Sequence, residues 1–223
     1  MGMLPPPPDR PPKRAPERSS ALDRGLAVLA LLADHPEGLT VSELAGRMSL
    51  SRPVVYRLLA SLLDHGYARR SGDGRVSIGP GVLRLSQRAQ SQVRRVAVPI
   101  LRRLAEATGA TAHLSLADGD EAVAVAVVEP SWTDFHVAYR TGSRHPLERG
   151  AAGRAILAAR GGRMTAVESS GELQPGAWGL AVAVPSALLE ASVGVVALGT
   201  LDQTAVVDPL QQAATALARA IGP

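Results

Sequence analysis

The side chains in this sequence best suited to chemistry are hydrogen-bond donors grouped at the start of a predicted helix. Arg52, Tyr56 and Arg57 share one face of that helix, and apolar residues at helical spacing occupy the other. Guanidinium and phenol groups in the first turns of a helix can reach base edges in the major groove of DNA. The chemistry that these residues predict is therefore recognition of bases and phosphates.

Two helices around a tight turn would position these donors. The spacing of apolar residues predicts a first helix from Val41 to Met48 and a second that begins after Ser51, whose hydroxyl can serve as an N-cap. Basic helix faces are also common where a helix is simply solvated, so this pattern alone leaves both interpretations open. The flanking segments favour DNA binding.

A β-hairpin is predicted directly after the helix pair. Residues 67–70 and 75–78 flank Ser71-Gly-Asp-Gly74, a sequence that tolerates the positive φ angles of tight turns. With an amphipathic helix over 20–33, the pair and the hairpin predict a winged helix-turn-helix over residues 19–80. The arginines expected to hold phosphates from the wing are Arg69, Arg70 and Arg75, and the leucines expected to face inward from the first helix are Leu22, Leu26, Leu29 and Leu32.

Positive charge concentrates in the first part of the chain. Residues 1–91 hold thirteen Lys or Arg against eight acids, whereas residues 92–223 hold eleven against twelve. Residues 1–18 contain seven of the seventeen prolines and predict a disordered arm, because such a segment cannot make a packed core. The arm is interpreted as an inert tail, or as a basic extension that adds non-specific phosphate contacts.

Composition limits the possible number of domains, the possible chemistry and the expected location of the protein. A chain of 223 residues with 46% hydrophobic and 3% aromatic content predicts one large or two modest domains with aliphatic cores. The absence of cysteine excludes disulfides and thiolate chemistry. Because no apolar run approaches the roughly 20 residues of a membrane span and residues 1–19 do not resemble a signal peptide, we expect a cytoplasmic protein with no membrane partner.

Catalysis finds little support in the sequence. The five histidines lack metal-ligand spacing and nucleophile partners, so no catalytic residue, metal or cofactor is predicted. Asp118, Asp120 and Glu121 are explained as the tip of a hairpin. Two histidines on expected strands, His113 and His136, are either ordinary sheet residues or polar points in a pocket.

The second part of the chain alternates between helical and strand-like spacing. A linker helix is expected over 81–92, and a second helix from Val93 to Thr108, with Pro99 as a kink or a break. Strands bracketed by helices predict an α+β domain over 93–223, with an antiparallel sheet covered on one side. Strands are expected at 111–117, 122–129, 135–140, 164–167, 178–184 and 193–201, and helices at 150–160 and 208–221.

The order of these motifs resembles the IclR family of bacterial transcriptional regulators, from Ser20 to Ile221. The segments that carry the resemblance include Ala21-Leu-Asp-Arg-Gly-Leu-Ala-Val-Leu29, Val55-Tyr-Arg-Leu-Leu-Ala60, Ile78-Gly-Pro-Gly-Val-Leu-Arg-Leu85 and Ala151-Ala-Gly-Arg-Ala-Ile-Leu-Ala158. The resemblance implies a winged helix joined by a linker helix to a GAF-like domain, whose antiparallel sheet is flanked by helices and senses a ligand.

The resemblance also implies a function. It indicates a regulator, more commonly a repressor, that binds a double-stranded DNA operator as a homodimer or tetramer and responds to a small organic effector. The positions that match the family's DNA-binding residues are Arg24, Ser51, Arg52, Pro53, Val54, Tyr56 and Arg57. The positions that match its effector site are Leu147, Gly150, Gly153, Gly179, Leu180, Ala181, Ala197 and Gly199.

Two departures from the family pattern bear on this function. Pro53 and Val54 replace small polar residues in the recognition helix, so they can touch a thymine methyl but cannot donate to guanine. Only residues 161–163 stand where the family inserts a few dozen residues beside the pocket. The alternative is therefore a constitutive DNA-binding protein whose C-terminal domain only dimerises. The matched pocket positions favour an apolar or aromatic ligand. Arg140, Arg144 and Arg149 either favour a carboxylate or are simply exposed charges on a sheet edge.

Overall fold

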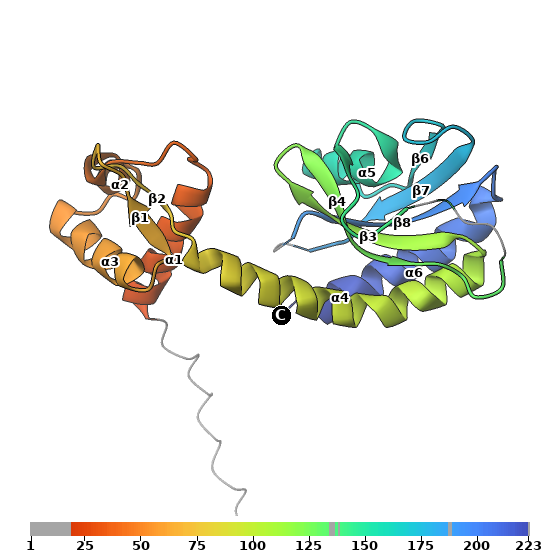
Figure 1. Cartoon of the computed structure of the whole chain (residues 1–223), viewed down its shortest axis with the longest axis horizontal. Coiled ribbons are helices and arrows are strands. Elements are labelled where there is room, and N and C mark those ends of the chain that lie inside the picture. The colour runs from red at the N-terminus through yellow and green to blue at the C-terminus, as the bar shows by residue number, and fades with distance from the viewer. Residues whose placement is uncertain (1–18, 134–136, 138, 187–188, 223) are drawn as a thin grey trace, which may run out of the picture. The chain divides into compact units, whose positions relative to one another are not determined.

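Two units divide the chain between Ser86 and Gln87. The computed structural model describes residues 19–133, 137, 139–186 and 189–222, which Figure 1 draws in colour. The predicted arm over 1–18 lies outside the described residues, as does His136. Each unit has its own apolar core, so the two are described separately.

The N-terminal unit is the predicted winged helix-turn-helix. Its helices are α1 (Ser20–Ala33), α2 (Val41–Arg47) and α3 (Arg52–Asp64), and its wing is the antiparallel pair β1 (Ala68–Arg70) and β2 (Val76–Ile78). The core consists of side chains that are spaced at helical intervals on the three helices, together with one residue from each strand. Its buried members include Val28, Leu32, Leu44, Val55, Leu59, Ala68 and Val76.

The expected inward face of α1 is partly wrong. Leu22 is 62% exposed and Leu26 is 55% exposed, whereas Val28 and Leu32 are buried in the core. The helix carries more than one apolar stripe, and only contact with α3 and β2 decides which stripe is covered. Periodicity within α1 cannot make that choice, because both stripes repeat at the same interval.

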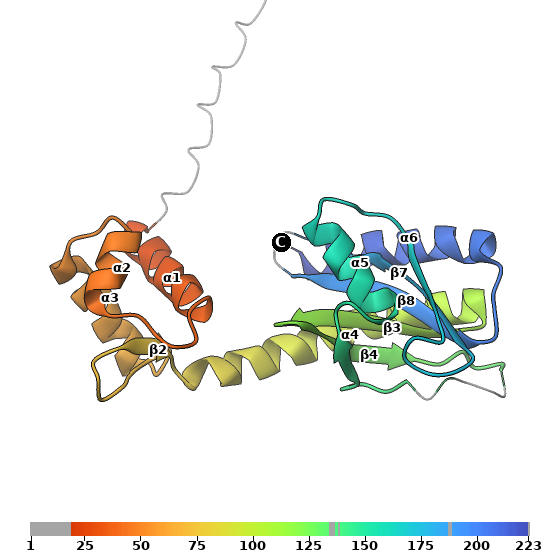
Figure 2. The ribbon, with the colours of Figure 1, turned by 90° about the horizontal axis from the view of Figure 1, so that it is seen from above.

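The C-terminal unit is built on a six-stranded antiparallel sheet. Its strands are β3 (Thr111–Asp118), β4 (Glu121–Val128), β5 (Arg144–Pro146), β6 (Val167–Ser170), β7 (Ala177–Ala183) and β8 (Ala191–Leu198), in the spatial order β5-β4-β3-β8-β7-β6. The last part of α4 (Gly81–Thr108) and α6 (Gln203–Ile221) cover one face, and α5 (Gly150–Arg160) covers the other (Figure 1, Figure 2). The antiparallel α+β fold is confirmed.

The sheet is covered on both faces, which corrects the expectation of one covered side. The expected helices over 81–92 and 93–108 are also one continuous helix, α4, with Pro99 inside it. Proline removes one hydrogen bond from a helix, but the apolar side of α4 packs on the sheet on both sides of Pro99, through Ala97 and Ile100. Tertiary packing therefore overrides the local break.

The edges of the sheet differ most from expectation. Of the strand predicted at 135–140, Val137, Tyr139 and Arg140 have no regular structure and the remaining residues lie outside the described part. The edge strand β5, which ends at Pro146, is not among the strands predicted from the sequence. Proline is tolerated there, since an edge strand leaves some N–H positions without a ladder partner. The strand expected at 164–167 begins at Val167, and the last helix begins at Gln203 instead of Asp208.

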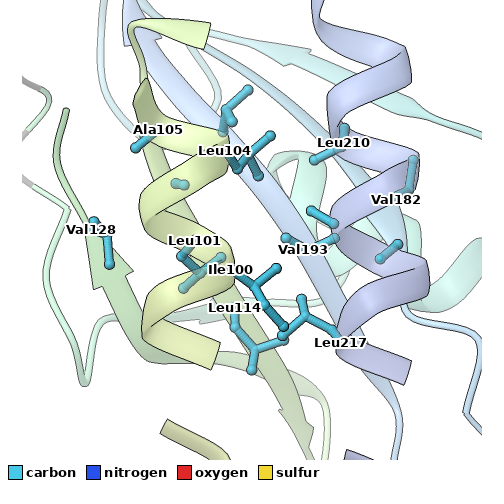
Figure 3. Packing of buried hydrophobic residues seen from close by; sticks show 14 of the residues in the cluster. Ile100, Leu101, Leu104, Ala105, Leu114, Val128, Val182, Val193, Leu210 and Leu217 are labelled. Atoms are coloured by element: carbon cyan, nitrogen blue, oxygen red, sulfur yellow. The ribbon is translucent and has the colours of Figure 1, made fainter. Parts of the chain in front are cut away.

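The main core fills the space between the sheet and the α4–α6 layer. Figure 3 shows side chains of α4 and α6 pointing toward residues of the strands. Along each strand, these residues alternate with residues that face α5. Because aromatic residues are few, this core is almost entirely aliphatic, and its side chains must interdigitate closely to exclude water. Its buried members include Leu101, Leu104, Leu114, Val182, Val193, Leu210 and Leu217.

Truncation of this core should destabilise the C-terminal unit. We expect Leu101→Ala to lower its free energy of unfolding by about 3 kcal/mol, because Leu101 is fully buried and its loss leaves a cavity. Leu198→Ala is the control, since Leu198 is exposed in the same unit and its truncation should cost under about 0.5 kcal/mol. Urea denaturation followed by circular dichroism measures both, and equal costs would contradict the assigned core.

Candidate functional site

The outer face of α3 presents the predicted DNA-binding side chains. Val55 and Leu59 anchor the helix in the core, which leaves Arg52, Tyr56 and Arg57 exposed on the opposite side. Pro53 is exposed in the first turn and Val54 is half-buried. Because the buried stripe fixes the helix, these exposed donors all project from one defined side of it, as direct reading of bases requires.

The start of α3 leaves a further hydroxyl at the surface. Ser51 occupies the N-cap position, as expected, but its side chain makes no capping hydrogen bond. The residue is exposed, so its hydroxyl faces solvent beside Arg52. Arg24, the candidate on α1, is exposed as well.

The wing arginines divide into two kinds. Arg69 and Arg70 on β1 are exposed, as expected for phosphate contacts. Arg75 instead supports the wing from within the unit, because its Nη1 donates to the carbonyl oxygen of Gly38 at 2.8 Å and lies 3.6 Å from Glu43. The sequence could not separate these roles, since Gly38 is far from Arg75 along the chain.

Glu43 connects this support to α2. Its carboxylate accepts hydrogen bonds from the backbone N–H and the hydroxyl of Thr40, at 2.7 and 2.9 Å, in a capping box. These hydrogen bonds, with smaller contributions from Arg75 and Arg47, hold the pKa of Glu43 below its ordinary value. The start of the helix-turn-helix and the wing are therefore joined through one carboxylate.

A cavity of about 250 Å³ lies between α5 and the sheet in the C-terminal unit. Helix α5 begins at its wall, where Ala151 and Ala152 line it, and Leu173 and Gln174 line it from the segment between β6 and β7. The strands contribute His113, Gly179 and Val195, among others. A small organic molecule fits a space of this size and mixed lining.

The structure brings few of the expected effector positions to this cavity. Of the eight, Gly179 lines it. Gly150 is the first residue of α5, with φ of +74°, and a Cβ there would lie 2.7 Å from the Leu173 side chain. Gly153 lies so close to the backbone of Leu147 that a Cβ would clash, so both residues serve the packing of α5.

The other five expected positions do not line the cavity. Leu147 is buried in a small cluster with Ala122 and Ile156. Leu180 points to the α4–α6 side, because neighbouring strand residues face opposite sides of a sheet. Ala181 packs against α5 in a small cluster with Ala151 and Ala155, and Ala197 packs against the main core. Gly199 is exposed past the end of β8.

Several polar side chains line the cavity close to one another. His113 is 5% exposed, its Nδ1 lies 3.3 Å from the Ser115 hydroxyl, and its ring meets that of Tyr139 edge to face, with centroids 5.0 Å apart. The Tyr139 hydroxyl lies 3.5 Å from Nε2 of His145. Of the two placements expected for His113, the structure supports both, since it is a buried sheet residue in the cavity wall.

Burial determines the charge of these groups. Loss of solvation, and to a smaller degree the neighbouring His145, lowers the pKa of His113 from 6.5 to about 3. Burial also raises the pKa of Tyr139, against a smaller opposing effect of Ser115. Both residues are therefore neutral near pH 7.

Several polar residues that line the cavity were not predicted from the sequence. Tyr139, Ser169 and Gln174 were not among the candidates, because no local pattern links them to the start of α5. Ser169 lies there because its hydroxyl accepts a hydrogen bond from the Ala151 N–H at 3.0 Å. Alternation along β6 places Ser169 on the same side as Val167, but the pairing with β7 is needed to say which side that is.

The three arginines expected near the cavity are mostly engaged elsewhere. Arg144 lines the cavity but forms ion pairs with Asp118 and Glu121. Arg149 donates to the carbonyl of Glu172. Arg140 lines a separate surface depression beside Glu129.

Within the described ranges, no three histidine or acidic side chains gather closely enough to hold a metal ion. No helix in the same ranges is long and apolar enough to cross a membrane.

Removal of the Arg75 side chain should loosen the wing. We expect Arg75→Ala to lower the melting temperature of the N-terminal unit, because the carbonyl of Gly38 loses a charge-assisted donor and Glu43 loses a cation. Arg70→Ala is the control, since that side chain is exposed on β1. Calorimetry of the full chain measures both, and equal melting temperatures would contradict a structural role for Arg75.

The buried neutral imidazole should make stability depend on pH. Because the folded-state pKa of His113 lies below 6.5, the unfolded chain takes up the proton first, so stability is lost as pH falls from about 6.5 toward 3. We expect the free energy of unfolding to fall more steeply between pH 6.5 and 4 for the wild type than for His113→Gln. The slopes of the two curves should differ by at most about 1.4 kcal/mol per pH unit. His65→Gln, at an exposed site, should follow the wild type, and parallel curves for wild type and His113→Gln would refute the assignment.

Comparison with known proteins follows the same division of the chain. Residues 21–72 match the model of the IclR helix-turn-helix domain, and residues 87–168 match that of the bacterial transcriptional regulator IclR C-terminal domain. The HTH-type transcriptional regulator BhcR of Paracoccus denitrificans is 34% identical over 142 residues, 62% of this chain and 50% of that protein. The DNA-binding transcriptional repressor YiaJ of Escherichia coli is 28% identical over 149 residues, 66% of this chain and 53% of that protein. The chain spans about half the length of the curated relatives it matches.

Solved structures share the fold over nearly the whole chain. An IclR-family regulator from Rhodococcus sp. superposes with a TM-score of 0.57 and 23% identity, over 95% of this chain and 97% of that one. An IclR homologue from Microbacterium hydrocarbonoxydans, solved in complex with 4-hydroxybenzoate, gives a TM-score of 0.50 and 20% identity, over 91% and 99% of the two chains. Both domain models of one family match in order along this sequence, and the chain belongs to the IclR family.

Proposed function

We propose that the chain is a sequence-specific DNA-binding transcriptional regulator, most consistent with a repressor, that responds to a small organic effector. The observation that carries the proposal is the exposed donor face of α3 in a winged helix-turn-helix that matches the family's DNA-binding domain. Relatives that are named as transcriptional repressors support repression. Such a protein would act in the cytoplasm, where its operator is accessible.

In this proposal α3 reads the major groove. Arg52 and Arg57 would donate to bases or phosphates, and Tyr56 would add a hydroxyl donor and an aromatic face. Pro53 and Val54 would favour a thymine methyl at the positions they touch. Arg69 and Arg70 would hold the backbone from the wing.

The two units would have different functions. Residues 19–80 would bind DNA, 81–92 would serve as the linker, and 93–223 would bind the effector and associate into a homodimer or tetramer. A symmetric assembly of this kind requires paired half-sites in the operator. The effector would act by preferring one of two populations that differ in affinity for DNA.

The cavity beside α5 supports the effector part of the proposal. Its volume of about 250 Å³ and its mixed lining suit a compact organic ligand. The related protein in complex with 4-hydroxybenzoate shows that this fold can accept a small aromatic molecule.

A constitutive DNA-binding protein is the second candidate. It is favoured by the short connection between Arg160 and Val167, which leaves little chain to enclose a ligand beside α5. Thermal denaturation in the presence of small aromatic compounds separates the two candidates. A sensor gains stability when its effector binds, whereas a domain that only dimerises gains none.

The DNA-binding face can be tested directly. We expect the protein to bind a duplex from upstream of its own gene more tightly than a scrambled duplex at physiological salt, measured by fluorescence anisotropy. In Arg52→Ala/Arg57→Ala the preference should disappear, and the dependence of affinity on salt should become less steep by about 2 in log–log slope if both residues contact phosphates.

Arg163→Ala is the matched control for this experiment. Arg163 is exposed in the C-terminal unit, so its loss removes a positive charge without changing α3. The control should bind like the wild type. If the wild type bound neither duplex at any salt concentration, the regulator proposal would be wrong.

A further inference from the structure

The first N–H group of α5 is occupied by an acidic side chain of the same unit. The Gly150 N–H donates to Oε2 of Glu172 at 2.8 Å, and Nη1 of Arg154 donates to Oε1 at 2.7 Å. Arg149 also donates to the main-chain carbonyl of Glu172. Both carboxylate oxygens of Glu172 are therefore held by groups that commonly bind anions in proteins.

Glu172 does not itself line the cavity, but it lies next to residues that do, at the rim. The next residues along α5, Ala151 and Ala152, line the cavity, and so do Leu173 and Gln174, which follow Glu172. Gly150 has no room for a side chain, because a Cβ would lie 2.7 Å from Leu173 and 3.6 Å from the ring of His145. The packing around Gly150 therefore fixes Glu172 beside the ligand space.

The cavity wall also contains neutral polar groups. His113 is 5% exposed and neutral, and its Nε2 lies over Gly194 of β8, where a Cβ would come within 2.7 Å of it. The hydroxyl of Tyr139 lies close by, next to His145. Groups of this kind can each donate or accept, so they suit a ligand hydroxyl, which also does both.

The cavity offers a ligand carboxylate little to replace the hydration that it loses on burial. Arg144, which lines it, forms ion pairs with Asp118 and Glu121, and Arg154 pairs with Glu172. An ionised acid loses much of its hydration when it is buried and needs a cation or several donors in return. The negative charge of Glu172 at the rim would repel it further.

We propose that Glu172 is a built-in carboxylate that occupies the anion-binding groups at the start of α5, so that the cavity selects an uncharged, hydroxyl-bearing ring compound over a carboxylic acid. The ligand's hydroxyl would meet His113 and Tyr139. This inference rests on the proposed effector-binding function and names the chemical class of the effector.

Phenol and benzoate are suitable probes, because they share a ring and differ in the polar group. Binding to the full chain is measured by isothermal titration calorimetry and by the shift in melting temperature. We expect phenol to bind the wild type and raise its melting temperature, and benzoate at the same concentration to do neither. His113→Phe should weaken phenol binding, because it removes the polar ring nitrogens from the cavity wall.

Substitution of Glu172 should reverse the selectivity. In Glu172→Ala the Gly150 N–H and Arg154 become available, so the affinity for benzoate should rise by about tenfold or more, with little change for phenol. Glu172→Gln removes the charge with almost no change of shape and should give a smaller gain, which also guards against misfolding of the alanine variant. Glu148→Ala, at an exposed acid near the start of α5, should bind both probes like the wild type.

Three outcomes would overturn the inference. They are benzoate binding to the wild type as tightly as phenol, no gain of benzoate affinity in either Glu172 variant, and no binding of either probe to any variant. None of these results affects the binding of DNA, which the anisotropy experiment tests independently. Failure of the ligand assignment is therefore distinguishable from failure of the regulator proposal.

Discussion

The close approach of α5 to the sheet is the constraint on which the C-terminal unit depends. Small residues make it possible, since Ala151 and Ala155 meet Ala181 and a Cβ at Gly153 would strike the backbone of Leu147. With α4 and α6 on the other face, the sheet is buried on both sides. The cavity lies at the start of α5, where the helix meets polar strand residues. Packing thus determines where a ligand can bind.

The polar groups around this cavity follow from the same constraint. Helix α5 brings its first N–H groups into contact with Ser169 on β6 and with Glu172 in the segment after it, and these side chains satisfy them. Burial on the α5 side holds His113 in its neutral form. A space that holds neutral donors and acceptors, with an acid at its rim, differs chemically from the arginine-rich mouth that the sequence suggested.

In the N-terminal unit, the basic residues are of two kinds: some are exposed at the surface, and one supports the wing. Val55 and Leu59 fix α3 in the core, and this leaves Arg52 and Arg57 at the surface. Arg75 instead donates to Gly38 and supports the hairpin. The distribution of charge along the sequence does not distinguish these arginines, although Arg75 has a structural role.

The sequence by itself determined the winged helix, the antiparallel α+β domain and the donor face of α3, because these depend on local periodicity, turn residues and short-range spacing. Only the tertiary structure decided which stripe of α1 is covered, that α4 continues through Pro99, and that Leu180 and Gly179 face opposite sides of the sheet. It also decided that Glu172 meets Gly150. Each of these outcomes depends on contacts between residues that are far apart in the chain, and a local sequence pattern does not predict such contacts.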